Sequence, residues 1–164
     1  MKSLWAPWRM EFIQETHKAG KKGLRPCIFC DLPKQAKSVK SLVLFKGKKA
    51  FVVLNRYPYT NGHLMVIPFR HLSEFEDLSS AEHQEMDKLL ARSIRALKKS
   101  SRPHGFNVGL NLGKASGAGI EGHLHYHVVP RWVGDSNFMP VIGETRTLPE
   151  FITQTYKKLV KCFS

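Results

Sequence analysis

The sequence predicts an α+β fold in which an antiparallel sheet packs with helices. Short β-rich runs separated by turn residues recur at 42–45, 50–54 and 63–67, as in an antiparallel meander. A helical stripe follows over residues 79–99. Two later segments, 105–112 and 123–129, alternate with the period of a strand. The chain of 164 residues has room for one domain with a sizeable core, so we expect a single domain over residues 1–164.

The helix after the third β-rich run is predicted by its first turn and by its apolar face. Ser79 and Glu82 form a capping box, in which each side chain accepts from a free backbone N–H at the helix start. Helical spacing then places five apolar residues on one face: Met86, Leu89, Leu90, Ile94 and Leu97. We expect this face to pack in the core.

The two ends of the chain are expected to be extensions of the domain. The N-terminal segment is rich in apolar residues, among them Trp5 and Trp8, and it needs a cover from its own domain or from a dimer partner. At the other end, Thr147 with Glu150 is expected to cap a last helix. The apolar face of that helix is expected to comprise Phe151, Ile152, Leu159 and Val160.

The formal net charge of +13 suits a polyanionic ligand such as a nucleotide, a polyphosphate or nucleic acid. Runs of lysine are nevertheless more often solvated loops than binding surfaces. No apolar run approaches the roughly 20 residues of a membrane span, and no secretory signal is visible. Three cysteines are too few for a secreted disulfide framework. We therefore expect a soluble, cytoplasmic protein with no membrane partner.

The strand predicted at 105–112 has an apolar and a polar face. Phe106, Val108, Leu110 and Leu112 are expected to face one way, and Asn107, Gly109 and Asn111 the other. The polar face is expected to border the histidines of the next strand. A turn rich in glycine, from Lys114 to Glu121, joins the two strands.

Three histidines at alternate positions dominate the next strand. His123, His125 and His127 are separated by Leu124 and Tyr126, so we expect all three imidazoles on one functional face. Histidine is neutral or charged near pH 7, and such a row suits metal binding, proton transfer or nucleophilic attack. The alternative is a surface strand that carries histidines by chance, but strict alternation of three disfavours it.

The segment His123 to Val129 resembles the signature of the histidine triad family of nucleotide hydrolases and transferases, in which histidines alternate with hydrophobic residues. The resemblance implies an antiparallel sheet of about five strands flanked by helices, in a protein that is usually dimeric. It also implies cleavage at the α-phosphorus of a nucleotide through a covalent nucleotidyl-histidine. Residues 4–10 and 144–150 resemble a bacterial and archaeal branch that includes diadenosine tetraphosphate phosphorylases.

The family pattern assigns roles to residues of this chain. His125 is expected to be the nucleophile, because an imidazole attacks through one nitrogen when the other donates its proton to a fixed acceptor. His127 is expected to contact the phosphate or the scissile oxygen, or merely to orient His125. Asn111 matches a position that hydrogen-bonds phosphate, and the alternative is a strand residue that bonds its neighbours. His63 resembles a histidine that supports the triad from the adjacent strand, and by itself it would be a core histidine.

Nucleotide contacts are expected from two further places. Asn55 matches a position that binds the ribose hydroxyls, and without the resemblance it would be a turn residue at a strand end. Ser116, Gly117 and Gly119 belong to a turn whose backbone N–H groups suit phosphate oxygens. A glycine-rich turn alone is a weak signal. The family's Ser or Thr before the first histidine is missing here, where Gly119 and Ile120 stand.

Cys27 and Cys30 form a CxxC motif, which in a cytoplasmic protein indicates a metal site or a redox pair. A structural zinc needs four ligands. His71 and His123 resemble the other two ligands of zinc-containing relatives, so the expected site is a structural zinc on these four residues. The alternative is a CxxC motif without metal.

The sequence thus predicts an enzyme that cleaves adenosine polyphosphates such as diadenosine tetraphosphate through nucleotidyl-His125, with water or phosphate as the acceptor. The expected partners are an adenosine nucleotide or dinucleoside polyphosphate and a second copy of the chain. Two alternatives remain open: a deadenylase of adenylylated nucleic acid, resembling aprataxin, and a nucleotide-binding scaffold with little turnover.

Overall fold

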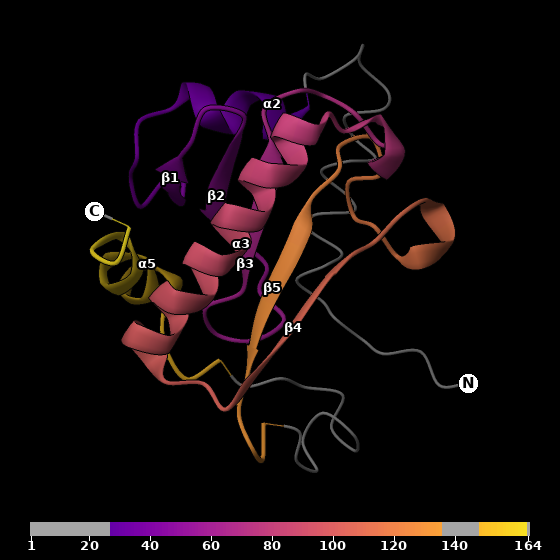
Figure 1. Cartoon of the computed structure of the whole chain (residues 1–164). Helices are drawn as coiled ribbons and strands as arrows, with labels where there is room; N and C mark the ends of the chain where they lie inside the picture. Colours follow the sequence, from indigo (N-terminus) through magenta and orange to yellow (C-terminus); the bar gives the residue numbers. More distant parts are fainter. Residues whose placement is uncertain (1–26, 136–147, 164) are drawn as a thin grey trace, which may run out of the picture.

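The structure is a computed structural model that describes residues 27–135 and 148–163. Within them, five strands form one antiparallel sheet in the order β1-β2-β3-β5-β4 (Figure 1). The strands are β1 (Val43–Lys46), β2 (Ala50–Leu54), β3 (Leu64–Pro68), β4 (Gly105–Leu110) and β5 (Tyr126–Arg131). The helices are α2 (Ile28–Asp31), α3 (Ser80–Ser101) and α5 (Ile152–Val160), with 3-10 turns η1 (Leu32–Lys34), η2 (Phe75–Asp77) and η3 (Lys114–Ser116). The predicted antiparallel α+β fold is confirmed.

The first three strands form the predicted meander and the centre of the core. Every residue of β2 and β3 is buried, and Phe51 pairs with Ile67 in an unbroken antiparallel register. Both faces of these strands are therefore covered, which explains why they read as continuous apolar runs in the sequence. The predicted limits of all three strands agree with the structure to within one residue.

Helix α3 lies across one face of the sheet (Figure 1) and packs mainly on β2, β3 and β5. The predicted capping box is present: the Glu82 N–H donates to Ser79 Oγ at 3.3 Å, and the Ser79 N–H donates to Glu82 Oε2 at 2.8 Å. The buried residues of the helix include Met86, Leu89 and Leu97 from the predicted stripe. The cap thus starts the helix where its apolar face meets the sheet.

The apolar face predicted for β4 is only half correct. Phe106 and Leu110 pack against the core, but Val108 is 44% exposed and Leu112 is 47% exposed and follows the end of the strand. The reason is that β4 is the edge strand of the sheet. Alternation in the sequence cannot tell an edge strand from a central one.

The histidine strand also differs from the prediction. β5 begins at Tyr126, so His123 and His125 lie in the approach to the strand, and only His127 is part of the ladder. The residues just before β5 are held by the loop after β3, because the Leu124 N–H donates to the Leu72 carbonyl at 2.7 Å. His123 is fully buried and His125 is 6% exposed, so the alternative of a surface strand is wrong.

Helix α5 begins later than its predicted cap. Thr147 lies outside the described residues, and Phe151, at the N-cap position, makes no side-chain cap hydrogen bond. Phe151 is 79% exposed, so its assignment to the apolar face is wrong. Leu159 is buried, and Ile152 and Val160 pack against the core, as predicted. Tyr156 is buried as well, and its hydroxyl donates to the Val43 carbonyl at 3.0 Å. That bond fixes α5 beside β1.

The N-terminal aromatic segment, with Trp5 and Trp8, also lies outside the described residues. In the described part of the chain, α3 and the other helices are too short or too polar to cross a membrane.

The packing of α3 generates a test of the fold. We expect Leu97→Ala to lower the free energy of unfolding by about 2–5 kcal/mol, because Leu97 is fully buried between α3 and the sheet. The matched control is Leu112→Ala, which is expected to cost less than about 1 kcal/mol at its half-exposed position. Urea unfolding of both variants gives the comparison, and equal losses would contradict this assignment of core and edge.

Candidate active site and metal centre

His127 is held between two neighbouring strands. It pairs with Met65 of β3 and Gly109 of β4, and its ring lies next to His63, which immediately precedes β3. The two imidazoles share a short contact, with His63 Nε2 at 2.9 Å from His127 Nδ1. The structure therefore brings together the two histidines that the sequence placed on adjacent strands.

Backbone groups decide which nitrogen of His63 carries a proton. The Tyr59 N–H donates to His63 Nδ1 at 3.2 Å, and the Asn55 amide lies at 3.2 Å from the same atom. A nitrogen that accepts a hydrogen bond carries no proton, so the proton of a neutral His63 is on Nε2. That Nε2–H then donates to His127 Nδ1.

The same reasoning extends to His127. Because its Nδ1 accepts from His63, the proton of a neutral His127 is on Nε2. This Nε2 is buried and has no hydrogen-bond partner among the described residues. A buried donor without a partner costs free energy, so His127 Nε2 is suited to an acceptor oxygen that comes from a ligand.

His125 has the opposite arrangement. Its Nδ1 donates to the backbone carbonyl of His123 at 2.8 Å, which leaves the lone pair on Nε2. The ring of His125 packs against His127 with centroids 4.8 Å apart, and against Phe29 with centroids 5.0 Å apart. Two neighbouring imidazoles thus offer opposite groups: His125 has a lone pair at Nε2, and His127 has an N–H at Nε2.

Burial keeps these imidazoles neutral. Burial, and then the neighbouring His127 and His125, lower the pKa of His63 to about 3. Burial, and then His125, lower the pKa of His127 to about 4. Burial lowers the pKa of His125 as well, against the hydrogen bond to the His123 carbonyl, which raises it. At pH 7 the three rings are therefore uncharged, as the assigned protons require.

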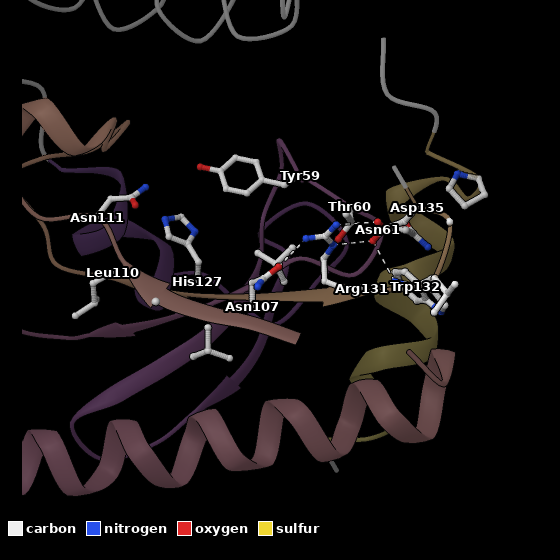
Figure 2. Close-up of a pocket in the computed structure, with 16 residues that line it drawn as sticks. Tyr59, Thr60, Asn61, Asn107, Leu110, Asn111, His127, Arg131, Trp132 and Asp135 are labelled. Carbon is white, nitrogen blue, oxygen red and sulfur yellow. Dashed lines mark hydrogen bonds and ion pairs between the residues drawn. The ribbon is translucent and has the colours of Figure 1, made fainter. Parts of the chain in front are cut away.

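A pocket of about 880 Å³ opens beside these histidines along β4 and β5. Figure 2 shows His127 and Asn111 at one end of it and Arg131, Trp132 and Asp135 at the other. Asn107, Gly109 and Asn111 all line the pocket, so the expected polar face of β4 does border the histidines. The volume is of the size that small-molecule sites have.

The other predicted nucleotide contacts lie outside this pocket. Asn55 accepts from the Tyr57 N–H at 3.0 Å and contacts His63, so its amide is directed at the protein in this structure. Ser116 donates to the Gly113 carbonyl in the exposed turn η3, which Gly117 ends with a positive φ of 81°. Gly119 is exposed in the same loop. The nucleotide roles of these four residues stay predictions.

Sequence reasoning missed two aromatic residues of the site. Tyr59 stacks on His127 with centroids 5.7 Å apart, and its backbone fixes the proton of His63. Phe29 packs edge-on against both His123 and His125. In the sequence, Tyr59 stands in the turn between two predicted strands, and Phe29 stands between Cys27 and Cys30. An aromatic residue four positions before His63 was the available signal.

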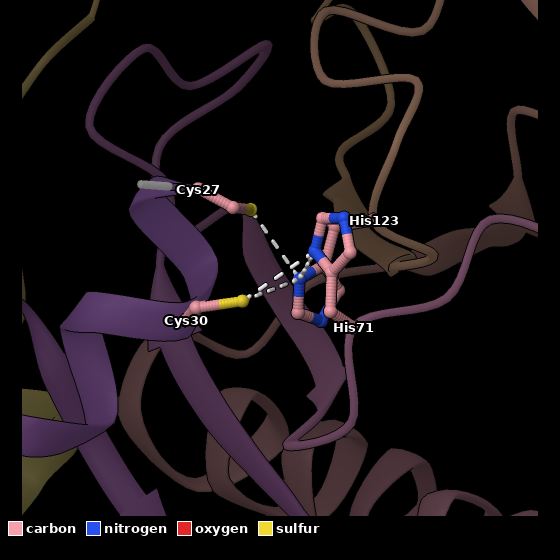
Figure 3. Close-up of side chains that lie close together, drawn as sticks. All are labelled: Cys27, Cys30, His71 and His123. Carbon is pink, nitrogen blue, oxygen red and sulfur yellow. Dashed lines mark hydrogen bonds between the residues drawn. The ribbon is translucent and has the colours of Figure 1, made fainter. Parts of the chain in front are cut away.

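Four potential metal ligands meet at the other side of His123 (Figure 3). The Sγ atoms of Cys27 and Cys30 and one ring nitrogen each of His71 and His123 lie within 4.8 Å of one another. His123 Nδ1 is 3.4 Å from Cys27 Sγ, 3.6 Å from Cys30 Sγ and 3.3 Å from His71 Nδ1. The structure thus brings together all four residues that the sequence proposed as ligands.

The three distances from His123 Nδ1 are close to the edges of a tetrahedral zinc site. Bonds of about 2.0–2.1 Å to nitrogen and 2.3 Å to sulfur give tetrahedron edges of about 3.3 Å between two nitrogens and 3.6 Å between nitrogen and sulfur. His123 presents Nδ1 for this purpose because its Nε2–H donates to the Pro68 carbonyl at 2.9 Å. Burial and the neighbouring Cys27 raise the pKa of the Cys30 thiol.

Comparisons with known proteins agree with this geometry. The family described as "HIT domain" matches residues 36–133. An AP-4-A phosphorylase of Mycobacterium tuberculosis is 42% identical over 97% of this chain and 83% of its own length. A bis(5'-adenosyl)-triphosphatase of Saccharomyces cerevisiae is 30% identical over 59% of this chain and 49% of its own. The crystal structure of a Zn-bound histidine triad family protein from Mycobacterium smegmatis has a TM-score of 0.66, with 25% identity over 84% of this chain and 92% of that one.

The low pKa of His63 generates a test based on acid stability. In the unfolded chain a histidine takes up a proton near pH 6.5, whereas folded His63 stays neutral down to about pH 3. The contribution of His63 to stability is therefore fully present above pH 6.5. As the pH falls below that value, this contribution lowers the free energy of unfolding by up to about 1.4 kcal/mol per pH unit. Between about pH 6 and pH 5, we expect His63→Gln to lose less unfolding free energy than the wild type, by up to about 1.4 kcal/mol.

The measurement is urea unfolding at several pH values for wild type, His63→Gln and the control His83→Gln on α3. An unchanged pH dependence in His63→Gln would contradict the neutral, proton-donating state of His63.

Proposed function

Because the chain belongs to the HIT domain family, we propose that it cleaves adenosine polyphosphates, such as diadenosine tetraphosphate, at the α-phosphorus through a covalent nucleotidyl-His125. The relatives named as a phosphorylase and a triphosphatase confirm the expectation of an enzyme. The observation that carries the proposal is the pair of assigned protons: His125 has a free lone pair at Nε2, and His127 next to it has a free N–H.

In the proposed first step, the Nε2 lone pair of His125 attacks the α-phosphorus. A phosphorus–nitrogen bond forms, and the bond from phosphorus to the bridging oxygen breaks. His127 Nε2–H donates to that oxygen as it leaves, because this donor is buried and lacks a partner in the described protein. With diadenosine tetraphosphate the leaving group is ATP.

The second step returns His125 to its starting state. An acceptor oxygen attacks the phosphorus, the phosphorus–nitrogen bond breaks, and the lone pair returns to His125 Nε2. Phosphate as acceptor gives ADP and water gives AMP. The name of the mycobacterial relative favours phosphate. The backbone carbonyl of His123 holds the His125 Nδ1–H throughout, so the ring keeps its orientation.

Asn111 and the glycine-rich turn are the proposed contacts of the phosphate oxygens. Asn111 lines the pocket beside His127. Ser116, Gly117 and Gly119 approach the phosphate only if the exposed turn closes on the nucleotide. The proposed ribose contact of Asn55 likewise requires its amide to exchange His63 for the ribose hydroxyls.

We also propose that Cys27, Cys30, His71 and His123 hold a structural zinc ion. The close approach of the four ligand atoms supports this, as does the zinc named for the similar mycobacterial structure. With four protein ligands the ion has no open position for a substrate, and it would tie α2 to the approach of β5. The predicted homodimer remains part of the proposal.

The nucleophile is tested by product analysis with diadenosine tetraphosphate, with and without inorganic phosphate. We expect ADP and ATP with phosphate, and AMP and ATP where water is the acceptor. His125→Ala is expected to lower the rate by roughly a thousandfold or more, because the covalent step is lost, while AMP still binds. The matched control His83→Ala, on α3, is expected to keep the wild-type rate.

Two outcomes would contradict the proposal. Turnover retained in His125→Ala would exclude the covalent intermediate on this residue. A wild-type protein that binds AMP but releases no product would favour the scaffold alternative, or adenylylated amines and nucleic acid ends as substrates.

The zinc proposal is tested by metal analysis of the purified protein. We expect about one zinc ion per chain in the wild type and a nearly complete loss in Cys27→Ser/Cys30→Ser, with a lower Tm, because half of the tetrahedral ligands are removed. Cys162→Ser is the matched control and is expected to keep the metal. Equal zinc content in the double variant would show that this cluster is not the binding site.

A further inference from the structure

The second half of α3 and the whole of α5 carry only positive charge. Residues 88–102 and 151–163 contain nine lysines and arginines and no aspartate or glutamate. All nine are exposed except Arg92, which is half-buried. The acidic residues of α3 lie in its first half, where Glu82 pairs with Arg70 and Glu85 accepts from the backbone N–H groups of Lys48 and Lys49.

Four of these cations form a line along α3, which we call the basic stripe: Lys88, Arg92, Arg95 and Lys99. Their spacing of four and three residues puts them on one side of the helix. With a rise of 1.5 Å per residue, the stripe is about 17 Å long. A helix that only needs solubility has no reason to align its cations, since mixed charges serve that purpose.

The middle of the basic stripe borders a hollow between α3 and the end of α5. The hollow has a volume of about 370 Å³ and is lined by Arg92, Arg95, Ala96, Lys99 and Cys162. No acidic side chain of the described residues forms a salt bridge with Arg95 or Lys99. Three cations thus surround a recess with a small, apolar floor, which suits a phosphate group.

Arg92 is held in place before any ligand arrives. Its guanidinium lies over Phe45, 4.0 Å from the ring centroid, and near Phe163, at 5.6 Å. Its Nη2 donates to the Phe163 carbonyl at 2.8 Å. A fixed guanidinium loses little conformational entropy on binding. Binding of an anion to Arg92 therefore costs less entropy than binding to a free surface arginine.

We propose that the basic stripe binds the phosphodiester backbone of nucleic acid, without reading its sequence. A linear array of cations matches a strand of regularly spaced phosphates, and such contacts supply most of non-specific binding. An anionic membrane fits less well, since none of the large hydrophobic side chains that are exposed lies on α3. The two rings next to Arg92 are covered by its guanidinium, so stacking of bases on them is not expected.

This surface is separate from the site of the proposed catalysis. Figure 2 shows α3 on one side of the β4–β5 ribbon, and His127, Tyr59 and Asn111 on the other. No residue of α3 lines the large pocket. Nucleic acid on the stripe is therefore a partner rather than the substrate, and this proposal stands or falls independently of the proposed function.

The test is fluorescence anisotropy of labelled oligonucleotides with the full chain, over about 50 to 200 mM salt. The probes are a single-stranded RNA and a DNA duplex, each about 20 nucleotides long. Both are longer than the basic stripe, because duplex charges recur every 3.4 Å per strand. We expect binding whose affinity falls steeply with salt, and the two probes identify which form of nucleic acid is preferred.

Two matched charge-reversal variants locate the surface. Arg95→Glu/Lys99→Glu is expected to weaken binding by roughly tenfold or more and to reduce the salt slope by about two. Arg56→Glu/Lys114→Glu changes the net charge equally but lies on neither helix, and it is expected to weaken binding by less than about threefold. Turnover of diadenosine tetraphosphate is expected to stay at the wild-type level in the stripe variant. If circular dichroism shows that Arg95→Glu/Lys99→Glu is misfolded, the neutral variant Arg95→Gln/Lys99→Gln is used in its place.

Three results would overturn the proposal. Equal losses in the two variants would assign the affinity to overall charge. Tighter binding to phosphatidylserine vesicles or to polyglutamate than to nucleic acid would assign the surface to a membrane or an acidic protein. Undetectable binding of both oligonucleotides at the lowest salt concentration would exclude the site.

Discussion

One residue, His123, couples the cluster of four potential metal ligands to the proposed nucleophile. Its Nδ1 belongs to the cluster, its Nε2–H donates to the Pro68 carbonyl, and its own carbonyl accepts from His125 Nδ1. A rotation of the imidazole would break the first two contacts, and a shift of the backbone would break the third. The site therefore depends on a residue that does no chemistry itself, and its complete burial is what makes the arrangement rigid.

The electrostatics of the protein divide into a neutral interior and a cationic surface. The chain has a net charge of +13, yet burial holds His63 and His127 uncharged, with pKa values of about 3 and 4. A protonated histidine would have no lone pair for attack and would repel its neighbours at ring distances near 5 Å. The positive charge is thus kept at the surface, while burial preserves the proton arrangement in the site.

How far the sequence predicts this protein depends on the range of the interactions involved. The capping box of α3 and the strands of the meander follow from local patterns, and the sequence placed both correctly. The start of β5 at Tyr126 depends on a bond from Leu124 to Leu72, far away in the sequence, so alternation alone extended the strand too far. The exposure of Val108 depends on which strand is at the edge. The four-residue cluster was found because two cysteines and two histidines resemble a known ligand set. The contact of Tyr59 with His127 has no such pattern.

The cluster also explains why His125 is so well covered. Phe29 stands between Cys27 and Cys30 in the four-residue helix α2, which is too short to hold its position by its own hydrogen bonds. With both cysteines anchored at the cluster, the Phe29 ring is placed edge-on against His125 and His123. Its ring excludes water from one side of His125, and this burial lowers the pKa of the imidazole. The cluster therefore acts on the proposed nucleophile twice, through the His123 carbonyl and through Phe29, without lying in the reaction path.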